Sequence, residues 1–217
     1  MISFFKNNNL LKQALTHRSW VNENSKNHGT NERLEFLGDA ILEFVVSKDI
    51  YSKFTNEEEG YLTALRANLV NTKNLSLVAT KLGIGEMILL SKGEIEGGGR
   101  TNPSLLADTV EAIIGALYID QGINASEKFI QDNILVDAEK KSQLPLKDPK
   151  SLLQEKVQAK SLPAPKYQVI EEAGPDHNKE FTIEVIINGK TEAKGVGKSK
   201  SEAEQDAATN ALENMLE

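Results

Sequence analysis

The most informative stretch of the chain reads Asn31-Glu32-Arg33-Leu34-Glu35-Phe36-Leu37-Gly38-Asp39-Ala40-Ile41-Leu42. Residues three, four and seven apart share a face of a helix, so Glu32, Glu35 and Asp39 form one stripe of carboxylates. Like charges at this spacing destabilise a helix by about 0.2–0.5 kcal/mol per pair. Such a stripe either lies in solvent or is held together by a bound cation. Because the ligands are oxygens without Cys or His, the cation they favour is Mg²⁺ or Mn²⁺.

A second acidic pair lies within an apolar segment, residues 102–118. Asn102 is a candidate N-cap, and Pro103 takes the first helical position. Asp108 and Glu111 then stand three residues apart in an otherwise hydrophobic helix. Acids in such surroundings are costly to bury unless they are paired or bind a metal. Packing this helix against the first would bring four carboxylates together, which predicts a divalent-metal site.

Two features of these helices have more than one interpretation. An acidic stripe on a helix is commonly a solvated face, although the two acids inside the second, apolar helix weigh against that interpretation. Gly38 is unusual because glycine inside a helix costs about 1 kcal/mol relative to alanine. It serves either ordinary close helix packing or backbone room at a crowded site or interface, and the sequence alone does not separate the two.

Bulk properties indicate a cytoplasmic protein of one or two domains. The 217 residues include no cysteine, which excludes disulfides and zinc-thiolate sites and fits a reducing cytosol. The longest apolar runs, residues 40–46 and 112–119, are far shorter than the about 18 residues needed to span a bilayer. Residues 1–9 show no cleavable signal pattern. We therefore expect no membrane contact.

The charge balance argues against nucleic-acid binding through bulk electrostatics, because the formal net charge is −7. Residues 1–147 carry 16 basic and 19 acidic side chains, and residues 148–217 carry 9 and 13. Neither part is basic as a whole. Any contact with nucleic acid must therefore come from a local patch.

Residues 1–140 are predicted to form an all-α domain. The expected helices are Glu32–Lys53, Tyr61–Val70, Asn74–Leu82, Pro103–Asp120 and Ala125–Glu139. Turn chemistry separates them at residues 83–85 and 97–99. The triple glycine at 97–99 predicts a mobile loop, because a phosphate-binding loop would need Gly-Lys-Ser/Thr before a helix.

Residues 141–148 are the expected linker, since proline and charged residues gather there. Residues 149–217 then predict a small α+β domain of order α-β-β-β-α. Its expected elements are the helix Pro149–Lys160, the strands Tyr167–Glu171, Lys179–Asn188 and Thr191–Val196, and the helix Ser201–Leu216. Asn188-Gly189 is a strong hairpin signal between the last two strands.

Taken together, these residues resemble a known family. The run Asn31–Asp39 is similar to the signature of bacterial ribonuclease III. The run Ala14–Ser19, the pair Glu59-Gly60 and the run Leu106–Glu111 fall where that family has its other motifs. The C-terminal order of elements resembles a double-stranded-RNA-binding domain. The resemblance extends from about Leu11 to the C-terminus.

The resemblance implies a metal-dependent endoribonuclease with a two-helix active site. Its metal ligands would be Glu35, Asp39, Asp108 and Glu111, with Asp39 and Glu111 as the catalytic pair and Glu111 the least replaceable. Glu32 and Glu59 match acids along the family's RNA path. We expect Mg²⁺ as the cofactor, Mn²⁺ as a substitute, and no organic cofactor. His17 is expected to pack between helices rather than to bind metal.

The resemblance also implies a homodimer with one active site per RNA strand. Phe36 matches a family aromatic that inserts into the other subunit. Cleavage would leave 5′-phosphate and 3′-hydroxyl ends with a short 3′ overhang, in RNA processing and maturation, including that of ribosomal and messenger RNA.

Contacts with double-stranded RNA are implied at three places in the second domain. Such domains recognise the shape of A-form RNA over about 16 base pairs. The residues that match the family's contacts are Gln154 and Glu155 on the first helix, His177 in the Gly174-Pro175-Asp176-His177 loop, and Lys198 and Lys200 before the last helix. Ser201 and Glu204 depart from the lysines that family members often have there, so we expect weak RNA affinity.

Three further residues flank the glycine loop of the first domain. Lys92, Arg100 and Asn102 stand where contact with phosphate is a possibility that the sequence leaves open.

We therefore predict a dimeric, Mg²⁺-dependent endoribonuclease specific for double-stranded RNA. One alternative is a non-catalytic double-stranded-RNA-binding regulator, and the four presumed ligands argue against it because a binding module has no need of clustered carboxylates. A second alternative is a metal-dependent phosphohydrolase acting on small nucleotides, against which the C-terminal domain argues.

Overall fold

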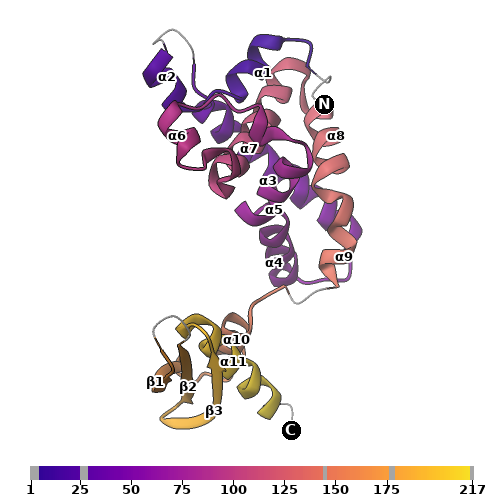
Figure 1. The fold of residues 1–217 in the computed structure, drawn as a ribbon. Helices are drawn as coiled ribbons and strands as arrows, with labels where there is room; N and C mark the ends of the chain where they lie inside the picture. The colour runs from indigo at the N-terminus through magenta and orange to yellow at the C-terminus, as the bar shows by residue number, and fades with distance from the viewer. Residues whose placement is uncertain (1–4, 25–28, 144–145, 176–178, 216–217) are drawn as a thin grey trace. The chain divides into compact units, whose positions relative to one another are not determined.

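The computed structural model describes residues 5–24, 29–143, 146–175 and 179–215. The chain divides into two compact units, Met1–Leu146 and Lys147–Glu217 (Figure 1). Each unit is described by itself below.

The first unit is helical, which confirms the predicted fold class. Its α-helices are α1 (Asn8–Ala14), α2 (Arg18–Asn24), α3 (Glu32–Lys53), α4 (Glu59–Val70), α5 (Thr72–Lys81), α6 (Lys92–Glu96), α7 (Pro103–Gln121), α8 (Ile123–Asn133) and α9 (Ala138–Ser142). Short 3-10 helices occur at Ile84–Glu86, Gly99–Thr101 and Leu135–Asp137. The only pairing of extended backbone among the described residues of this unit is a parallel bridge between Thr16 and Leu89.

The core of the first unit is built around α7. From Leu106 to Leu117 only Asp108 and Glu111 are not buried, so the helix has apolar neighbours on nearly every side. It packs most extensively against α3 and next against α5. A helix that is hydrophobic all round is expected at the centre of a domain. The two partly buried acids of α7 are therefore exceptions within the core helix.

Two parts of the helical pattern differ from the prediction. The expected helix Ala125–Glu139 is instead α8 followed by a 3-10 turn and α9, with the break at Ile134. Ile134, Leu135 and Ala138 are all buried, so packing onto the core extends through the break. The helices α1, α2 and α6 were not predicted. They have only five to seven residues, and isolated helices of that length are unstable without tertiary contacts.

The second unit has the predicted order α-β-β-β-α. It consists of α10 (Pro149–Ala159), β1 (Lys166–Ala173), β2 (Glu180–Ile187), β3 (Lys190–Gly197) and α11 (Lys200–Asn214). The strands form an antiparallel sheet in the order β1-β2-β3. Asn188 and Gly189 both have positive φ, 50° and 80°, as a two-residue hairpin turn requires.

The core of the second unit lies between the sheet and its two helices. Val185 and Ile187 of β2 face the buried alanines of α11 and the buried Leu153 and Val157 of α10. Gly195 of β3 lies against α11 so closely that an added Cβ would stand 2.0 Å from the backbone nitrogen of Ala207. Within the described ranges of the chain, no helix has the length and apolarity needed to cross a bilayer.

Candidate active site

The helices α3 and α7 touch through two glycines. A Cβ added to Gly38 would lie 1.7 Å from the carbonyl oxygen of Glu111, and one added to Gly115 would lie 2.1 Å from that of Leu34. The two backbones are thus in direct contact, and only glycine permits this approach. Both interpretations of Gly38 therefore hold at once, because the close packing occurs against Glu111, a predicted site residue.

Three carboxylates meet at this crossing. Glu35, Asp108 and Glu111 each offer an oxygen, and these oxygens all lie within 4.8 Å of one another. Glu35 stands one turn before Gly38, and Glu111 one turn before Gly115, so the glycine contact itself brings the acids together. All three side chains are partly buried. An all-oxygen donor set of this kind fits a hard divalent cation.

The electrostatics of the three acids are those of a crowded anionic cluster. Burial, followed by the charges of Asp39, Asp108 and Glu35, raises the pKa of Glu111 to about 8. Burial and then Asp108 also raise the pKa of Glu35. The pKa of Asp108 is raised by burial, against a lowering contribution from His17. Acids with raised pKa values that share a pocket are typical of functional sites.

The fourth predicted ligand, Asp39, is not part of this group of three. Its side chain is exposed on the turn of α3 after Glu35. Its charge is nevertheless felt at the cluster, because it helps to raise the pKa of both Glu35 and Glu111. Asp39 therefore lies near the site without joining the three oxygens that converge.

The acids predicted to support the RNA path lie at the starts of α3 and α4. Glu32 accepts from the Thr30 hydroxyl at 2.9 Å and pairs with Arg18 at 3.4 Å. Glu59 accepts from the Thr63 hydroxyl at 2.9 Å. Glu59 also lines a surface hollow of about 450 Å³ between α3 and α4. Neither acid belongs to the cluster of three.

The predicted RNA contacts of the second unit lie on exposed surface. Gln154 and Glu155 are exposed on α10, and Glu155 pairs with Lys147 at 2.6 Å. Lys198 and Lys200 stand at the start of α11, where Lys200 pairs with Glu172 at 3.2 Å. His177 lies outside the described residues.

The comparisons with known proteins agree with this geometry. The family profile described as Ribonuclease-III-like matches residues 7–138, and the one described as Double-stranded RNA binding motif matches residues 149–215. This chain belongs to the ribonuclease III family. The profile of the nuclease domain covers more than half of the chain, and the matched segments fall within the two units in turn.

Curated members of the ribonuclease III family match this chain over almost its whole length. Ribonuclease 3 of Geobacillus sp. (strain WCH70) is 49% identical over 98% of this chain and 87% of the relative. Ribonuclease 3 of Staphylococcus aureus (strain Newman) is 44% identical over 97% of this chain and 87% of the relative.

A solved structure supports the fold of the first unit. The nuclease domain of ribonuclease III from Campylobacter jejuni matches with a TM-score of 0.56 and 44% identity, over 60% of this chain and 87% of that one. Its description mentions a region involved in dimer formation.

Phe36, which the family resemblance places at a dimer interface, is 82% exposed. Phe44 and Tyr51 of the same helix are also exposed. With 3.6 residues per turn, the three aromatics fall within about a quarter of the helix circumference. The helix therefore carries three exposed aromatic side chains on one side.

The residues around the glycine loop serve the fold. The Arg100 guanidinium donates to the carbonyl oxygens of Gly85 and Ile88, at 2.7 and 3.4 Å. The Asn102 side chain caps α7 by accepting from the backbone of Ser104. Lys92 is exposed. Arg100 and Asn102 thus stabilise the fold, whereas Lys92 takes part through its backbone nitrogen, which donates to the Glu23 carboxylate at 3.1 Å.

Two features of the site went unrecognised in the sequence. His17 acts electrostatically on Asp108, and its Nδ1 lies 2.8 Å from the Ser19 hydroxyl; its position in the Ala14–Ser19 motif was the available signal. Arg66 of α4 pairs with Glu43 at 2.8 Å, and Glu43 also helps to raise the pKa of Glu111. No local pattern predicts that pair, because it joins two helices.

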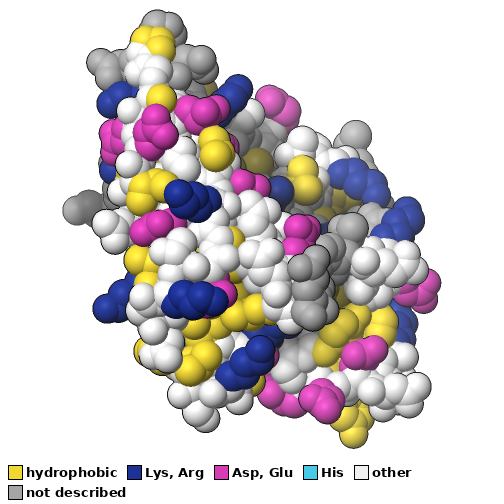
Figure 2. All heavy atoms as spheres, turned by 90° about the horizontal axis from the view of Figure 1, so that it is seen from below, with side chains coloured by type: hydrophobic (Ala, Val, Ile, Leu, Met, Phe, Trp, Pro, Cys, Tyr) yellow, Lys and Arg dark blue, Asp and Glu magenta, His cyan; other side chains and the backbone are white. Residues whose placement is uncertain are grey.

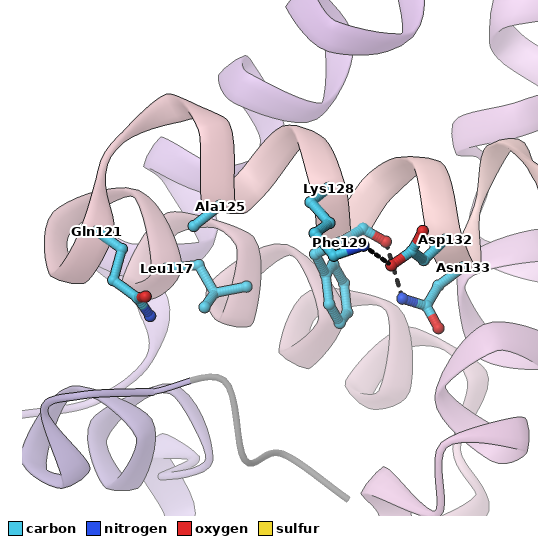
Figure 3. Close-up of a pocket in the computed structure, with 7 residues that line it drawn as sticks. All are labelled: Leu117, Gln121, Ala125, Lys128, Phe129, Asp132 and Asn133. Carbon is cyan, nitrogen blue, oxygen red and sulfur yellow. Dashed lines mark hydrogen bonds and ion pairs between the residues drawn. The ribbon is translucent and has the colours of Figure 1, made fainter.

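A separate pocket lies between the end of α7 and α8 (Figure 3). It measures about 220 Å³ and is lined by apolar side chains such as Leu117 and Phe129, with the ion pair Lys128–Asp132 at one end. None of the predicted site residues lines it. The carboxylate cluster, and not this pocket, is therefore the candidate active site.

Proposed function

We propose that this chain is an endoribonuclease that hydrolyses double-stranded RNA with a divalent cation, Mg²⁺ or in its place Mn²⁺, leaving 5′-phosphate and 3′-hydroxyl ends. The observation that carries the proposal is the meeting of Glu35, Asp108 and Glu111 oxygens within 4.8 Å, in a chain that also has a double-stranded-RNA-binding motif. A non-catalytic RNA-binding regulator has no physical need for such a cluster. Family membership supports the same function.

The cluster residues would hold the cation, with Asp39 as a further ligand. When bound, a divalent cation lowers the pKa of water and neutralises charge on the phosphodiester. Glu111 is the central residue, since it lies in the cluster and also forms the backbone contact with Gly38. Its raised pKa shows how unfavourable its charge is without a counter-charge, so it gains most from a cation. Asp39 and Glu111 form the proposed catalytic pair.

Substrate contacts are proposed in both units. Glu32 and Glu59 would lie along the RNA path beside the cluster. In the second unit, Gln154, Glu155, His177, Lys198 and Lys200 would meet the minor grooves and phosphates of the duplex. We take residues 1–140 as the nuclease domain, 141–148 as the linker and 149–217 as the RNA-binding domain. The absence of cysteine supports a cytoplasmic location.

We further propose that the chain works as a homodimer in which Phe36 contacts the second copy. Its 82% exposure and the neighbouring Phe44 and Tyr51 support this role. Sedimentation of Phe36→Ala should show a shift toward monomer, whereas Leu77→Ala, at an exposed leucine on α5, should leave the dimer intact. A dimer unaffected by Phe36→Ala would refute the interface.

The direct test is cleavage of a long end-labelled RNA duplex with Mg²⁺ or with EDTA, beside single-stranded RNA and duplex DNA. Cutting of duplex RNA alone, and only with the metal, is the expected result. Binding without cutting would favour the regulator. Hydrolysis of nucleoside triphosphates in a parallel assay, with no cutting of the duplex, would favour the phosphohydrolase. Analysis of the ends should show 5′-phosphate and 3′-hydroxyl groups.

A further inference from the structure

The two lysines at the start of α11 are not equally available to bind phosphate. Lys198 is exposed, and its ammonium group forms no ion pair in the part of the chain that the structure describes. Lys200, by contrast, lies with its Nζ 3.2 Å from Oε1 of Glu172 and 5.5 Å from the centre of the Phe181 ring. Both lysines have been proposed to bind phosphate, yet only the Lys200 ammonium group is held in an ion pair with a carboxylate.

The sheet explains why Lys200 is held. Glu172 of β1 and Phe181 of β2 are cross-strand partners, so they stand side by side. The Glu172 carboxylate and the Phe181 ring together bind the Lys200 ammonium group, which extends toward them from α11. The ion pair is still accessible, because 58% of the Lys200 side chain and 42% of the Glu172 side chain are exposed.

The backbone at the start of α11 is also occupied by protein groups. The Ser199 hydroxyl accepts from the backbone nitrogen of Glu202, and the Glu202 carboxylate accepts from that of Lys198 at 2.9 Å. The carboxylate thus reaches one residue beyond the N-cap, whose own nitrogen it would bond in a standard capping box. Two backbone nitrogens at this helix start are therefore already bonded to side chains of the protein.

The same interleaving of charges extends around the second unit. Lys150 pairs with Glu204 and Lys190 with Glu192. The face drawn in Figure 2 shows basic and acidic side chains interspersed, without one continuous basic patch. Lys147 pairs with the proposed contact Glu155, but of the ion pairs named here only Lys200–Glu172 involves a lysine proposed to bind phosphate.

We propose that Glu172 competes with RNA phosphate for Lys200 and thereby sets the affinity of this domain for duplex RNA. The inference rests on the proposed role of Lys200 in RNA binding. A duplex that docks at Lys200 must displace the Glu172 carboxylate. The lysine then exchanges one anionic partner, the carboxylate, for another, the phosphate. Because the freed carboxylate attracts cations in turn, the net release of counterions is smaller than it would be for an unpaired lysine.

The test uses the full chain in EDTA, with binding to a labelled RNA duplex of about 20 base pairs measured by anisotropy over a range of salt. Glu172→Gln should tighten binding about two- to fivefold at low salt. It should also steepen the plot of log affinity against log salt by up to about one unit. A gel of the same samples checks that the duplex stays intact.

Glu171→Gln is the matched control. It removes the same charge from the adjacent position of β1, but side chains alternate between the faces of a strand, and Glu171 has no ion pair among the described residues. Its effect should be smaller and should leave the salt slope nearly unchanged. Equal effects of the two variants would show that only net charge matters, and the proposed competition would be wrong.

Lys200→Ala separates this inference from the role on which it rests. If Lys200→Ala leaves affinity unchanged, Lys200 does not anchor RNA, and both statements fail. If it weakens binding while Glu172→Gln matches Glu171→Gln, only the competition fails. The double variant should bind like Lys200→Ala alone, because without the lysine the carboxylate has nothing to mask.

Discussion

The two units of this ribonuclease shift the pKa values of their acidic residues in opposite directions. At the crossing of α3 and α7, three carboxylates face one another; burial raises the pKa of all three, and repulsion from neighbouring carboxylates raises those of Glu35 and Glu111 further. At the start of α10, hydrogen bonds from Ser151 and Gln205 lower the pKa of Asp148 to about 2. An acid with several hydrogen-bond donors stabilises the fold, whereas acids that are partly buried beside one another mark the candidate active site.

The largest expected effect follows from removing the central acid of the cluster. Glu111→Gln should reduce the rate of duplex cleavage by more than about 100-fold, since even groups that only support metal ligands are worth about 10–100-fold. Duplex binding should persist, because the proposed RNA contacts of the second unit are untouched. Single-turnover cleavage and anisotropy measure the two quantities.

Glu127→Gln is the matched control for that variant. Glu127 pairs with Lys48 at 2.7 Å, outside the cluster, so cleavage should stay within a few-fold of the unaltered chain. If Glu111→Gln abolished binding as well as cleavage, the assignment of the cluster to catalysis alone would be mistaken.

The close helix approach can be broken separately in each unit. Gly38→Ala places a Cβ 1.7 Å from a backbone oxygen of α7, and Gly195→Ala places one 2.0 Å from a backbone nitrogen of α11. Each should destabilise its own unit by about 3 kcal/mol, at the upper end of overpacking costs. Hydrogen exchange should show faster exchange in one unit only.

Only Gly38→Ala should also separate the carboxylates and abolish cleavage by the folded fraction. Gly93→Ala is the control, because a Cβ there meets nothing within 4 Å. Loss of protection in both units from either glycine variant would argue against two independent cores.

The pH dependence of the metal-free chain should differ between the units. Glu111 has a pKa raised from 4.5 to about 8 in the folded state. Its contribution to stability is therefore fully present below about pH 4.5 and is lost as the pH rises through about 8. In EDTA, the melting temperature of the first unit should fall over that window.

Added Mg²⁺ should reverse the fall at high pH, because a cation that binds only the folded state stabilises it. The same scan of Glu111→Gln should be flatter. A melting temperature that rises from pH 5 to pH 8 in EDTA would contradict the picture of a repulsive cluster.

The smallest expected effect concerns Asp148, the structural acid. Asp148→Ala should destabilise the second unit by about 1 kcal/mol, the usual cost of losing an N-cap. Because the pKa of Asp148 is lowered, its stabilisation is present above pH 3.8 and is lost as the pH falls through about 2.

Asp148→Asn, which retains a capping oxygen, should be nearly neutral at pH 7 but should lack that acid sensitivity. Hydrogen exchange of the second-unit amides from pH 7 downward measures both variants. A cost from Asp148→Asn as large as that from Asp148→Ala would show that the charge, rather than the cap, is what stabilises the helix.

Sequence patterns predicted the long elements well. The bounds of α3 were predicted as found, because Glu32–Lys53 has a long apolar periodicity. The convergence of Glu35, Asp108 and Glu111 also followed from two local patterns and one assumption about packing.

Interactions between residues far apart in the sequence were harder to predict from sequence patterns. The contact of Gly115 with Leu34, the pairing of Arg66 with Glu43 and the nearness of His17 to Asp108 all join separate elements. Periodicity describes one helix at a time, so such pairs are invisible until the helices are docked. The position of Asp39 outside the three converging oxygens is of the same kind.

The glycine crossing also has a consequence for the time course of synthesis. Its two halves lie on α3, which ends at Lys53, and on α7, which ends at Gln121. At about 5–20 residues per second, the 68 residues that separate these ends take about 3–14 s to translate. A growing chain thus carries no assembled nuclease centre during that interval, even though the signature helix has already been made.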